Sequence, residues 1–321
     1  MTHNDLDAIV VGAGVCGLTT AICLAEAGLR TRIRTASPPE RTTSVAAGAI
    51  WGPVMTGPAG RVREWARTGL KVLTGLEAEP AAGIRTRSGR EVSRVPAGPP
   101  AWADLLPGLR LCGQPELPEG FAAGWRYAAP VATMPVYLGY LRARFERAGG
   151  GIEVAAVDSL AALDAPLVVN CTGTGARDLV PDPAVIPVRG QVVLVTNPGI
   201  VEFHIDRRDG SADYVYVFPH GDTLLLGGTA ERGARDMAPR PEVAERILAD
   251  CRAFDPRLRG AEVIGHRVGL RPYRPEVRLE AETLPDGRVL WHNYGHGGAG
   301  VTLSWGCARE ITEAVTAGAR G

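Results

Sequence analysis

Three features of the sequence predict an α/β fold for this chain of 321 residues. Residues 8–35 follow the order of an apolar strand, a glycine-rich turn, a helix and a second strand. Residues 164–170, DAPLVVN, are typical of a further buried strand. From residue 189 onward, β-rich segments recur at hairpin-like intervals. Strand–helix units combined with antiparallel strands indicate one unit assembled from discontinuous segments and a second, sheet-based unit.

The pattern of each segment predicts its secondary structure. Residues 8–11 form a continuous apolar run, as a strand buried on both faces does. Residues 18–27 have the length and composition of a helix that ends at Gly28, and residues 32–35 alternate as a short strand. Three prolines predict a loop over residues 36–53. Further helices are expected at 62–73, 134–148 and 241–254, and further strands at RGQVVLVT (189–196), DYVYVFP (213–219), DTLLLGG (222–228) and RVLWHNY (288–294).

Composition and charge exclude several classes of protein. The formal net charge is zero and no run of like charges occurs, which argues against a nucleic-acid or anionic-membrane partner. The six cysteines form no CxxC pair, so disulfides and metal clusters are not expected, and a reducing cytoplasm is the predicted location. The uncharged stretch 8–25 follows the acidic segment MTHNDLD and contains three glycines, which excludes a targeting or membrane segment.

The turn after the first strand has the pattern GxGxxG, formed by Gly12, Gly14 and Gly17. The first glycine allows the tight turn, the second admits a pyrophosphate, and the third lets the helix pack closely on the strand. The segment therefore predicts dinucleotide binding at a helix N-terminus. An acidic residue that would hold the ribose, expected about 20 positions further on, is missing, because the second strand ends in RTAS (34–37) and Glu40 is the nearest carboxylate. The motif thus leaves FAD and NAD as alternatives.

Residues 291–308, WHNYGHGGAGVTLSWGCA, combine closely spaced glycines with specific polar side chains. Such glycines let backbone approach a ligand closely, so a cradle for a ligand is predicted here. His292 and His296 have the spacing of a metal pair on a helix, but the glycines between 295 and 300 disfavour a helix and no metal site is predicted. No GxSxG or HExxH motif points to hydrolysis.

The segment GLRPYRPEVRLE, residues 269–280, places three arginines around two prolines. Arg271 lies between Leu270 and Pro272, and a guanidinium held so rigidly suits the bidentate capture of a carboxylate. For Arg274 and Arg278, a solvated strand edge is an equal alternative. Tyr216 either adds a phenolic hydrogen bond to the same ligand or is an ordinary strand aromatic.

These motifs together resemble the D-amino-acid oxidase family of FAD-dependent oxidases. The string HNYGHGGAGV, residues 292–301, matches the C-terminal signature of that family. Further matches follow the order of the chain: VVGAGVCGL, TTSVAAGAIW, VVNCTG, RGQ, YVFP, LGG and GLRPYRPEVRLE. The resemblance therefore covers nearly the whole sequence.

The resemblance implies a Rossmann-like FAD-binding domain built from residues 1–51, 131–188 and 283–321. A substrate-binding domain with a mixed, mostly antiparallel sheet would comprise residues 52–130 and 189–282. It also implies oxidation of a D-amino acid by hydride transfer to flavin N5, giving a 2-oxo acid, ammonia and hydrogen peroxide. The cofactor would be non-covalent FAD, and the partners a D-amino acid and oxygen, with a homodimer left open.

The resemblance also assigns roles to residues. Arg271 would bind the substrate carboxylate with help from Tyr216, the Gly298 carbonyl would accept from the amine, and no side chain would act as acid or base. The cofactor would be held by Gly12, Gly14, Gly17, Thr42, Thr43, Ala47, Gly48, Val157, Cys171, Thr172, Gly173, Gly297, Gly298, Gly300, Val301 and Thr302.

This sequence departs from the family pattern at several positions. Ala36 and Ser37 replace an acidic residue and an arginine after the second strand. Small or apolar residues at Gly52 and Val54, with Phe203 and Phe218, predict a pocket for neutral side chains. Arg207 and Arg208 could reach in and favour acidic substrates, but each has an adjacent aspartate in DRRDG, which predicts a solvated turn instead. Oxidation of acidic D-amino acids, glycine or sarcosine, and a flavin-binding protein without oxidase activity, are the alternatives.

Overall fold

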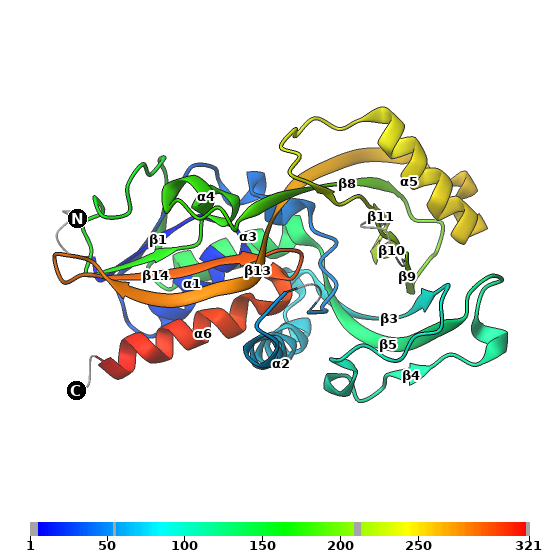
Figure 1. The fold of residues 1–321 in the computed structure, drawn as a ribbon, viewed down its shortest axis with the longest axis horizontal. Helices are drawn as coiled ribbons and strands as arrows, with labels where there is room; N and C mark the ends of the chain where they lie inside the picture. The colour runs from blue at the N-terminus through cyan, green and yellow to red at the C-terminus, as the bar shows by residue number, and fades with distance from the viewer. Residues whose placement is uncertain (1–5, 54–55, 209–212, 319–321) are drawn as a thin grey trace.

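The computed structural model describes residues 6–53, 56–208 and 213–318. In one half of the molecule, five strands are parallel in the order β14-β7-β1-β2-β6. Their bounds are β1 (Ala8–Val11), β2 (Thr31–Thr35), β6 (Gly151–Val154), β7 (Leu167–Asn170) and β14 (Val289–His296). The helices of this half are α1 (Val15–Glu26), α2 (Ala59–Gly75), α3 (Met134–Arg147), α4 (Ala176–Leu179) and α6 (Gly300–Gly318). Figure 1 shows α1 and α6 on one side of these strands and α4 on the other.

Both faces of β1 are buried, which explains its uninterrupted apolar sequence. Ala8 and Val10 pack into the large core that contains the apolar faces of α1 and α6. Ile9 and Val11 point the other way, into a second cluster with Val168 of β7. Side chains alternate along a strand, so a strand covered on both faces must be apolar at every position.

The other half of the molecule is mostly antiparallel. Its strands are β3 (Ile84–Ser93), β4 (Arg110–Leu111), β5 (Ala123–Ala132), β8 (Ile186–Thr196), β9 (Phe203–Arg207), β10 (Val215–His220), β11 (Thr223–Gly227) and β12 (Glu231–Arg232). They follow the order β4-β5-β3-β9-β10-β11-β8, in which only β3 and β9 are parallel neighbours, and β12 pairs with β8. Helix α5 (Pro241–Phe254) covers one face through Ile247 and Cys251, which pack on Val217 and Leu226.

Strand β13 (Val263–Thr283) joins the two halves. Its first part pairs with β8 and its last part with β14, so the described strands form one continuous sheet. Figure 1 shows β8 and β13 crossing from one half to the other. The pairing with β14 shifts register between Tyr273 and Arg278, where Pro275 has no N–H to donate. Because the sheet runs through both halves without a break, it does not mark where one domain ends and the other begins. The predicted domain boundaries therefore stay a prediction.

The predicted α/β class is confirmed, and most elements lie where their patterns place them. The helix expected at 241–254 is α5 without change of bounds, whereas α1 starts at Val15, three residues before the expected helix. The segment 269–280 lies within β13: residues 269–273 pair with β8, whereas residues 278–280 pair with β14 alone, as the strand-edge alternative for Arg278 expects. Strands β3 and β5 were not predicted, and neither was α6 directly after the glycines. Short 3-10 helices lie at Pro39–Arg41, Thr43–Ala46, Leu76–Ala78, Pro80–Ala82, Ala103–Leu105, Gln114–Glu116, Gly173–Gly175 and Pro256–Gly260.

Candidate active site

A cavity of about 660 Å³ lies where the two halves of the sheet meet. Its volume is in the range that small-molecule and cofactor sites occupy. Segments from both halves form its wall: residues 11–16, 35–37, 41–44, 46–52, 171–175 and 269–273, with parts of 293–301. The carboxyl ends of β1 and β7 reach this wall, which is where open α/β sheets bind ligands.

The turn between β1 and α1 forms one part of the wall. Gly12 has a φ of 108°, and a Cβ on this residue would lie 2.5 Å from the Cys171 carbonyl oxygen. Gly14 precedes the first turn of α1, where Gly14 and Val15 both line the cavity. Gly17 does not line it; a Cβ there would lie 1.9 Å from the Gly12 carbonyl oxygen. Gly17 therefore lets the helix pack on the turn and aims the helix N-terminus at the cavity.

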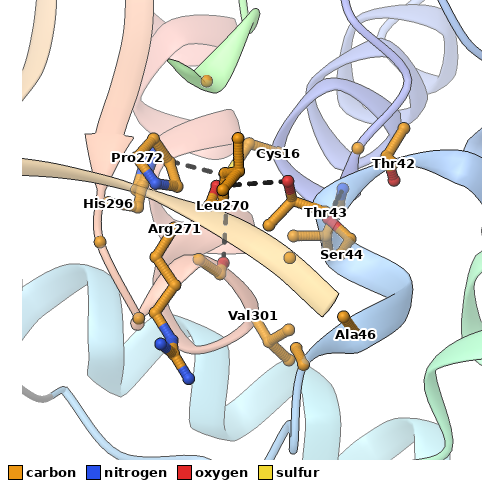
Figure 2. A pocket seen from close by; sticks show the side chains of 18 of the residues that line it. Cys16, Thr42, Thr43, Ser44, Ala46, Leu270, Arg271, Pro272, His296 and Val301 are labelled. Carbon is orange, nitrogen blue, oxygen red and sulfur yellow. Dashed lines mark hydrogen bonds between the residues drawn. The ribbon is translucent and has the colours of Figure 1, made fainter. Parts of the chain in front are cut away.

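The loop 42–48 closes a second part of the wall. Thr42, Thr43, Ala47 and Gly48 all line the cavity. The Thr43 hydroxyl donates to the Leu270 carbonyl at 3.2 Å, which ties the loop to β13, and Figure 2 shows this contact beside the Arg271 side chain. Val157, Cys171, Thr172 and Gly173 line the cavity as well.

The C-terminal glycines connect β14 to α6. Gly297, with a φ of 53°, donates its N–H to the Pro272 carbonyl at 2.9 Å. The cavity wall includes Gly297, Gly298, Gly300 and Val301. Thr302 lies behind the wall, where its hydroxyl accepts from the Gly52 N–H at 3.0 Å. The start of α6 thus faces the cavity, as the start of α1 does.

His296 directly precedes these glycines, is buried and also borders the cavity. Its Nδ1 lies 3.6 Å from the Cys16 sulfur and its Nε2 lies 3.6 Å from the Cys307 sulfur. Burial lowers the pKa of His296 to about 4, so the ring is neutral at physiological pH. His292 contacts Asn170 instead, through Nδ1 at 3.4 Å. Within residues 6–53, 56–208 and 213–318, no group of three or more His, Cys, Asp or Glu side chains is arranged to hold a metal ion.

Arg271 and Tyr216 lie in the same cavity, although 55 positions of sequence separate them. The Arg271 Nη1 donates to the Thr229 carbonyl at 2.9 Å. A Cβ on Gly190 would lie 2.3 Å from this Nη1, and a Cβ on Gly227 would lie 1.8 Å from the Tyr216 Cζ. The glycines of the segments RGQ and LGG therefore provide the space that these two side chains occupy.

Several wall residues were not identified from the sequence. Trp51 and Trp102 meet edge to face at 5.6 Å, and Trp102 meets Tyr127 in the same way at 5.5 Å. Glu91 of β3 also lines the cavity, as does Tyr214. No sequence pattern indicated Trp102 or Glu91, because β3 and the loop that follows it have no apolar alternation. Phe218 lines the cavity, but Phe203 packs behind Tyr127, and Val54 lies outside the described residues.

The prediction that DRRDG is a solvated turn was wrong for Arg207. Its Nε donates to the Glu91 carboxylate at 3.0 Å inside the cavity wall. Asp206 is buried and binds Arg94 at 3.2 Å. Arg208 points elsewhere and binds Asp250 of α5 at 3.0 Å. The two arginines therefore bind partners in different elements and do not act together.

The part of the wall that follows β2 also differs from the usual dinucleotide pattern. Ala36, Ser37 and Arg41 line the wall after β2. The hydroxyl of Thr35 donates to the Ser37 carbonyl at 2.7 Å and so fixes this bend. A serine and an arginine therefore stand where a carboxylate is common.

The fold and the glycine-lined cavity at two helix starts are those of a nucleotide-binding protein. The chain belongs to the family described as FAD dependent oxidoreductase, whose model matches residues 7–314. It is 50% identical over 306 residues to a D-amino-acid oxidase of Rubrobacter xylanophilus, covering 94% of each chain. It is 49% identical over 310 residues to a D-amino-acid oxidase of Streptomyces coelicolor, covering 96% of each. A human D-aspartate oxidase is 36% identical over 323 residues, with 96% of this chain and 94% of the human protein covered.

A solved structure with a similar fold supports the architecture of this chain. The structure of glycine oxidase from Bacillus cereus superposes with a TM-score of 0.81 at 18% identity, covering 97% of this chain and 95% of that one. The family predicted from HNYGHGGAGV is confirmed, and FAD is the cofactor. Among the described helices, none has the length and apolar character needed to cross a bilayer.

The residues present fit FAD. Two helix N-termini, those of α1 and α6, open into one cavity and offer backbone N–H groups. The wall at Gly12, Gly297 and Gly298 is bare backbone that a planar or phosphate-bearing group can approach. One helix start suits a pyrophosphate, and the other suits the part of a flavin that gains negative charge on reduction.

Proposed function

We propose that this protein is an FAD-dependent oxidase that converts neutral D-amino acids to 2-oxo acids, ammonia and hydrogen peroxide. The observation that carries this proposal is the position of Arg271 and Tyr216 in the same cavity as the Gly12 turn and the glycines of 297–300. A guanidinium and a phenol next to a flavin site are suited to hold an amino-acid carboxylate. The names of the two relatives near 50% identity support the same activity.

Each part of the wall receives a role. Arg271 binds the substrate carboxylate, Tyr216 adds a hydrogen bond, and the Gly298 carbonyl accepts from the amine. Thr42, Thr43, Ala47, Gly48, Val157, Cys171, Thr172, Gly173, Gly297, Gly300 and Val301 hold the cofactor together with Gly12 and Gly14. Gly17 and Thr302 act indirectly, by placing the two helix starts.

The chemistry that bound FAD would supply is acceptance of a hydride from the substrate α-carbon, with oxygen as the final acceptor of the electrons. The residues around it then need only to orient the substrate and exclude water. His296 is neutral and enclosed by two thiols, and Glu91 is paired with Arg207, so neither is placed as a general base. The side chains therefore contribute to the rate by orienting the substrate, and Arg271 is the main residue that does so.

The wall favours neutral side chains. Trp51, Trp102 and Phe218 offer apolar surface, and burying a medium aliphatic side chain contributes about 1.5–3 kcal/mol. Acidic D-amino acids are the second candidate, because one relative is a D-aspartate oxidase. Glycine and sarcosine bury less surface and would bind more weakly.

Peroxide release with a panel of D- and L-amino acids, glycine and sarcosine tests the proposal. D-valine and D-methionine should exceed D-aspartate in kcat/KM, and L-isomers should be inert because their α-hydrogen would face away from the flavin. A preference for D-aspartate would overturn the neutral substrate class. A yellow protein that releases no peroxide with any of them would instead be a flavin-binding protein without oxidase activity.

We also propose that FAD is bound without a covalent link, as the glycine-lined wall suggests. Acid precipitation should release all of the yellow colour into solution. Colour that stays with the precipitated protein would contradict this.

A further inference from the structure

A second charged group faces the cavity in addition to Arg271. Glu91 is 6% exposed, and its carboxylate accepts from the Arg207 Nε at 3.0 Å and from the Tyr127 hydroxyl at 3.1 Å. Glu91, Tyr127 and Arg207 all line the cavity. They come from three strands, β3, β5 and β9, which are neighbours in the sheet. The network is therefore built into the sheet and does not depend on a surface loop.

We infer that Glu91 determines the charge selectivity of the enzyme by neutralising Arg207, so that the substrate side chain meets a wall without net charge. The inference rests on the D-amino-acid oxidation proposed above. Without the Glu91 carboxylate, the cavity would present a free guanidinium, and the same wall would then select acidic side chains. Specificity would then have two sources: Glu91 would disfavour acidic substrates, and contacts with the cavity wall would favour neutral ones.

Arg207 has the properties of a carboxylate-binding group. Its side chain is 34% exposed, and the Nε–Glu91 contact uses one of the five N–H donors of a guanidinium. Charge-assisted hydrogen bonds to a carboxylate are strong where water is excluded. An acidic substrate would have to compete with Glu91 for Arg207, because the Glu91 carboxylate already binds the guanidinium.

Arg207 and Tyr127 hold the Glu91 carboxyl group by its two oxygens. Burial raises the pKa of the Glu91 carboxyl, while the charge of Arg207 and the Tyr127 hydrogen bond act in the opposite direction. A buried carboxylate without its partner is costly, so the pair stays together. An acidic side chain that approached Arg207 would also approach the Glu91 charge, and like charges in a dry site repel strongly.

The pair lies in the same cavity as Arg271, the proposed carboxylate-binding residue. Tyr214, which lines the cavity, is affected by the charges of Arg207, Glu91 and Arg271 together; burial is the main cause that raises its pKa. Glu91, Arg207 and Arg271 line the same cavity as Tyr214. A substrate whose carboxylate is bound by Arg271 has its side chain within reach of the field of the pair.

The experiment compares Glu91→Gln with the wild-type holoenzyme on two isosteric substrates, D-glutamate and D-glutamine. The ratio of their kcat/KM values should shift toward D-glutamate by about tenfold or more, as for other close charge pairs. Succinate and succinamate, titrated against the absorbance of the oxidised flavin, should show the same shift in the ratio of Kd values. Glutamine keeps the shape of residue 91 and can still accept from Tyr127.

Two further variants make the test specific. The double variant Glu91→Gln/Arg207→Gln should lose the gain, because no guanidinium remains for the second carboxylate. Arg208→Gln is the matched control: its guanidinium binds Asp250 outside the cavity wall, so it should leave both ratios unchanged.

Three results would overturn the inference: unchanged ratios in Glu91→Gln, the same shift in the double variant, or a shift in Arg208→Gln. If Glu91→Gln did not fold, Arg207→Gln alone would decide, since it leaves the Glu91 charge in place and should disfavour succinate further. Failure of the proposed function would look different. In that case the wild type would oxidise neither substrate, while the succinate and succinamate titrations would still report the charge of the cavity.

Discussion

Arg271 of β13 extends over Gly190 of β8, and this close approach is the residue-scale feature on which the proposed substrate binding depends. The guanidinium is fixed by the Thr229 carbonyl and lies in the cavity wall. A bidentate clamp needs both the charge and the planar fork of an arginine. The side chain that binds and the glycine that makes room for it therefore act as one unit.

Replacing Arg271 by alanine should abolish most of the activity while leaving FAD bound. Breaking a buried ion pair costs roughly 3–5 kcal/mol, which corresponds to about two to four orders of magnitude in kcat/KM. Arg271→Lys keeps the charge but lacks the planar fork, so its kcat/KM should lie between the values for the wild type and Arg271→Ala. A loss of tenfold or less in the alanine variant would mean that another residue carries the carboxylate.

Gly190→Ala should weaken substrate binding without touching the substrate. The new Cβ would lie 2.3 Å from the Arg271 Nη1, so the guanidinium must move away from the position in which it binds. We expect KM to rise by about tenfold or more, since a displacement near 1 Å can cost that much. Gly265→Ala is the control, because a Cβ at Gly265 of β13 would meet no atom within 4 Å. Equal KM values in the two variants would contradict the packing argument.

At the scale of elements, the cofactor site depends on where two helices begin. Both α1 and α6 start at the cavity, each directly after a glycine-containing turn that follows a strand. Polar groups at helix starts are unpaired, and an anionic group satisfies them. We therefore expect the position of each helix start to affect cofactor binding.

Gly17→Ala should reduce FAD affinity, although Gly17 does not line the cavity. Its Cβ would lie 1.9 Å from the Gly12 carbonyl oxygen, and this backbone contact can be relieved only by moving α1 away from the turn. Fluorescence titration of the apoprotein should show an FAD Kd raised by about tenfold or more, the effect of roughly 1.4 kcal/mol. In the control, Gly139→Ala within α3, the Cβ meets nothing within 4 Å, and the exchange should leave FAD affinity unchanged. An unchanged FAD Kd for Gly17→Ala would show that α1 can shift without loss of FAD affinity.

For the whole molecule, buried histidines link stability to pH. Burial lowers the pKa values of His204, His220 and His296 to about 4, compared with an ordinary value of 6.5. The folded protein keeps these rings neutral, whereas the unfolded chain binds protons below pH 6.5. The stabilisation is therefore fully present above pH 6.5 and is lost as the pH falls from 6.5 toward 4.

The free energy of unfolding should decrease over this window by roughly 1 kcal/mol per pH unit for each histidine. Urea unfolding at pH 7.5, 6.5, 5.5 and 4.5 would measure the decrease, and proton uptake on unfolding at pH 5 would check its origin. His204→Leu should make the pH dependence shallower, because one site of proton uptake is removed. A free energy that stays constant between pH 6.5 and 4.5 would contradict the prediction.

The sequence by itself determined the local elements, the family and the cofactor. The apolar run 8–11 and the glycines after it predict a buried strand, a turn and a helix, because burial on both faces and close packing leave few other residues possible. Helix α5 was predicted to the residue by its apolar spacing. The string HNYGHGGAGV was specific enough to predict the family, although its spacing did not reveal that a helix follows it at Gly300.

Only the tertiary structure decided which distant side chains meet in the cavity. Strands β3 and β5 carry charged residues and glycine without regular alternation, so neither Glu91 nor Tyr127 stood out. The aspartate next to Arg207, Asp206, suggested local pairing, but neighbouring side chains in a strand point to opposite faces. Arg207 therefore finds its partner on β3, more than a hundred residues away in the sequence. Pairing between strands is set by the sheet as a whole, and a local pattern does not contain it.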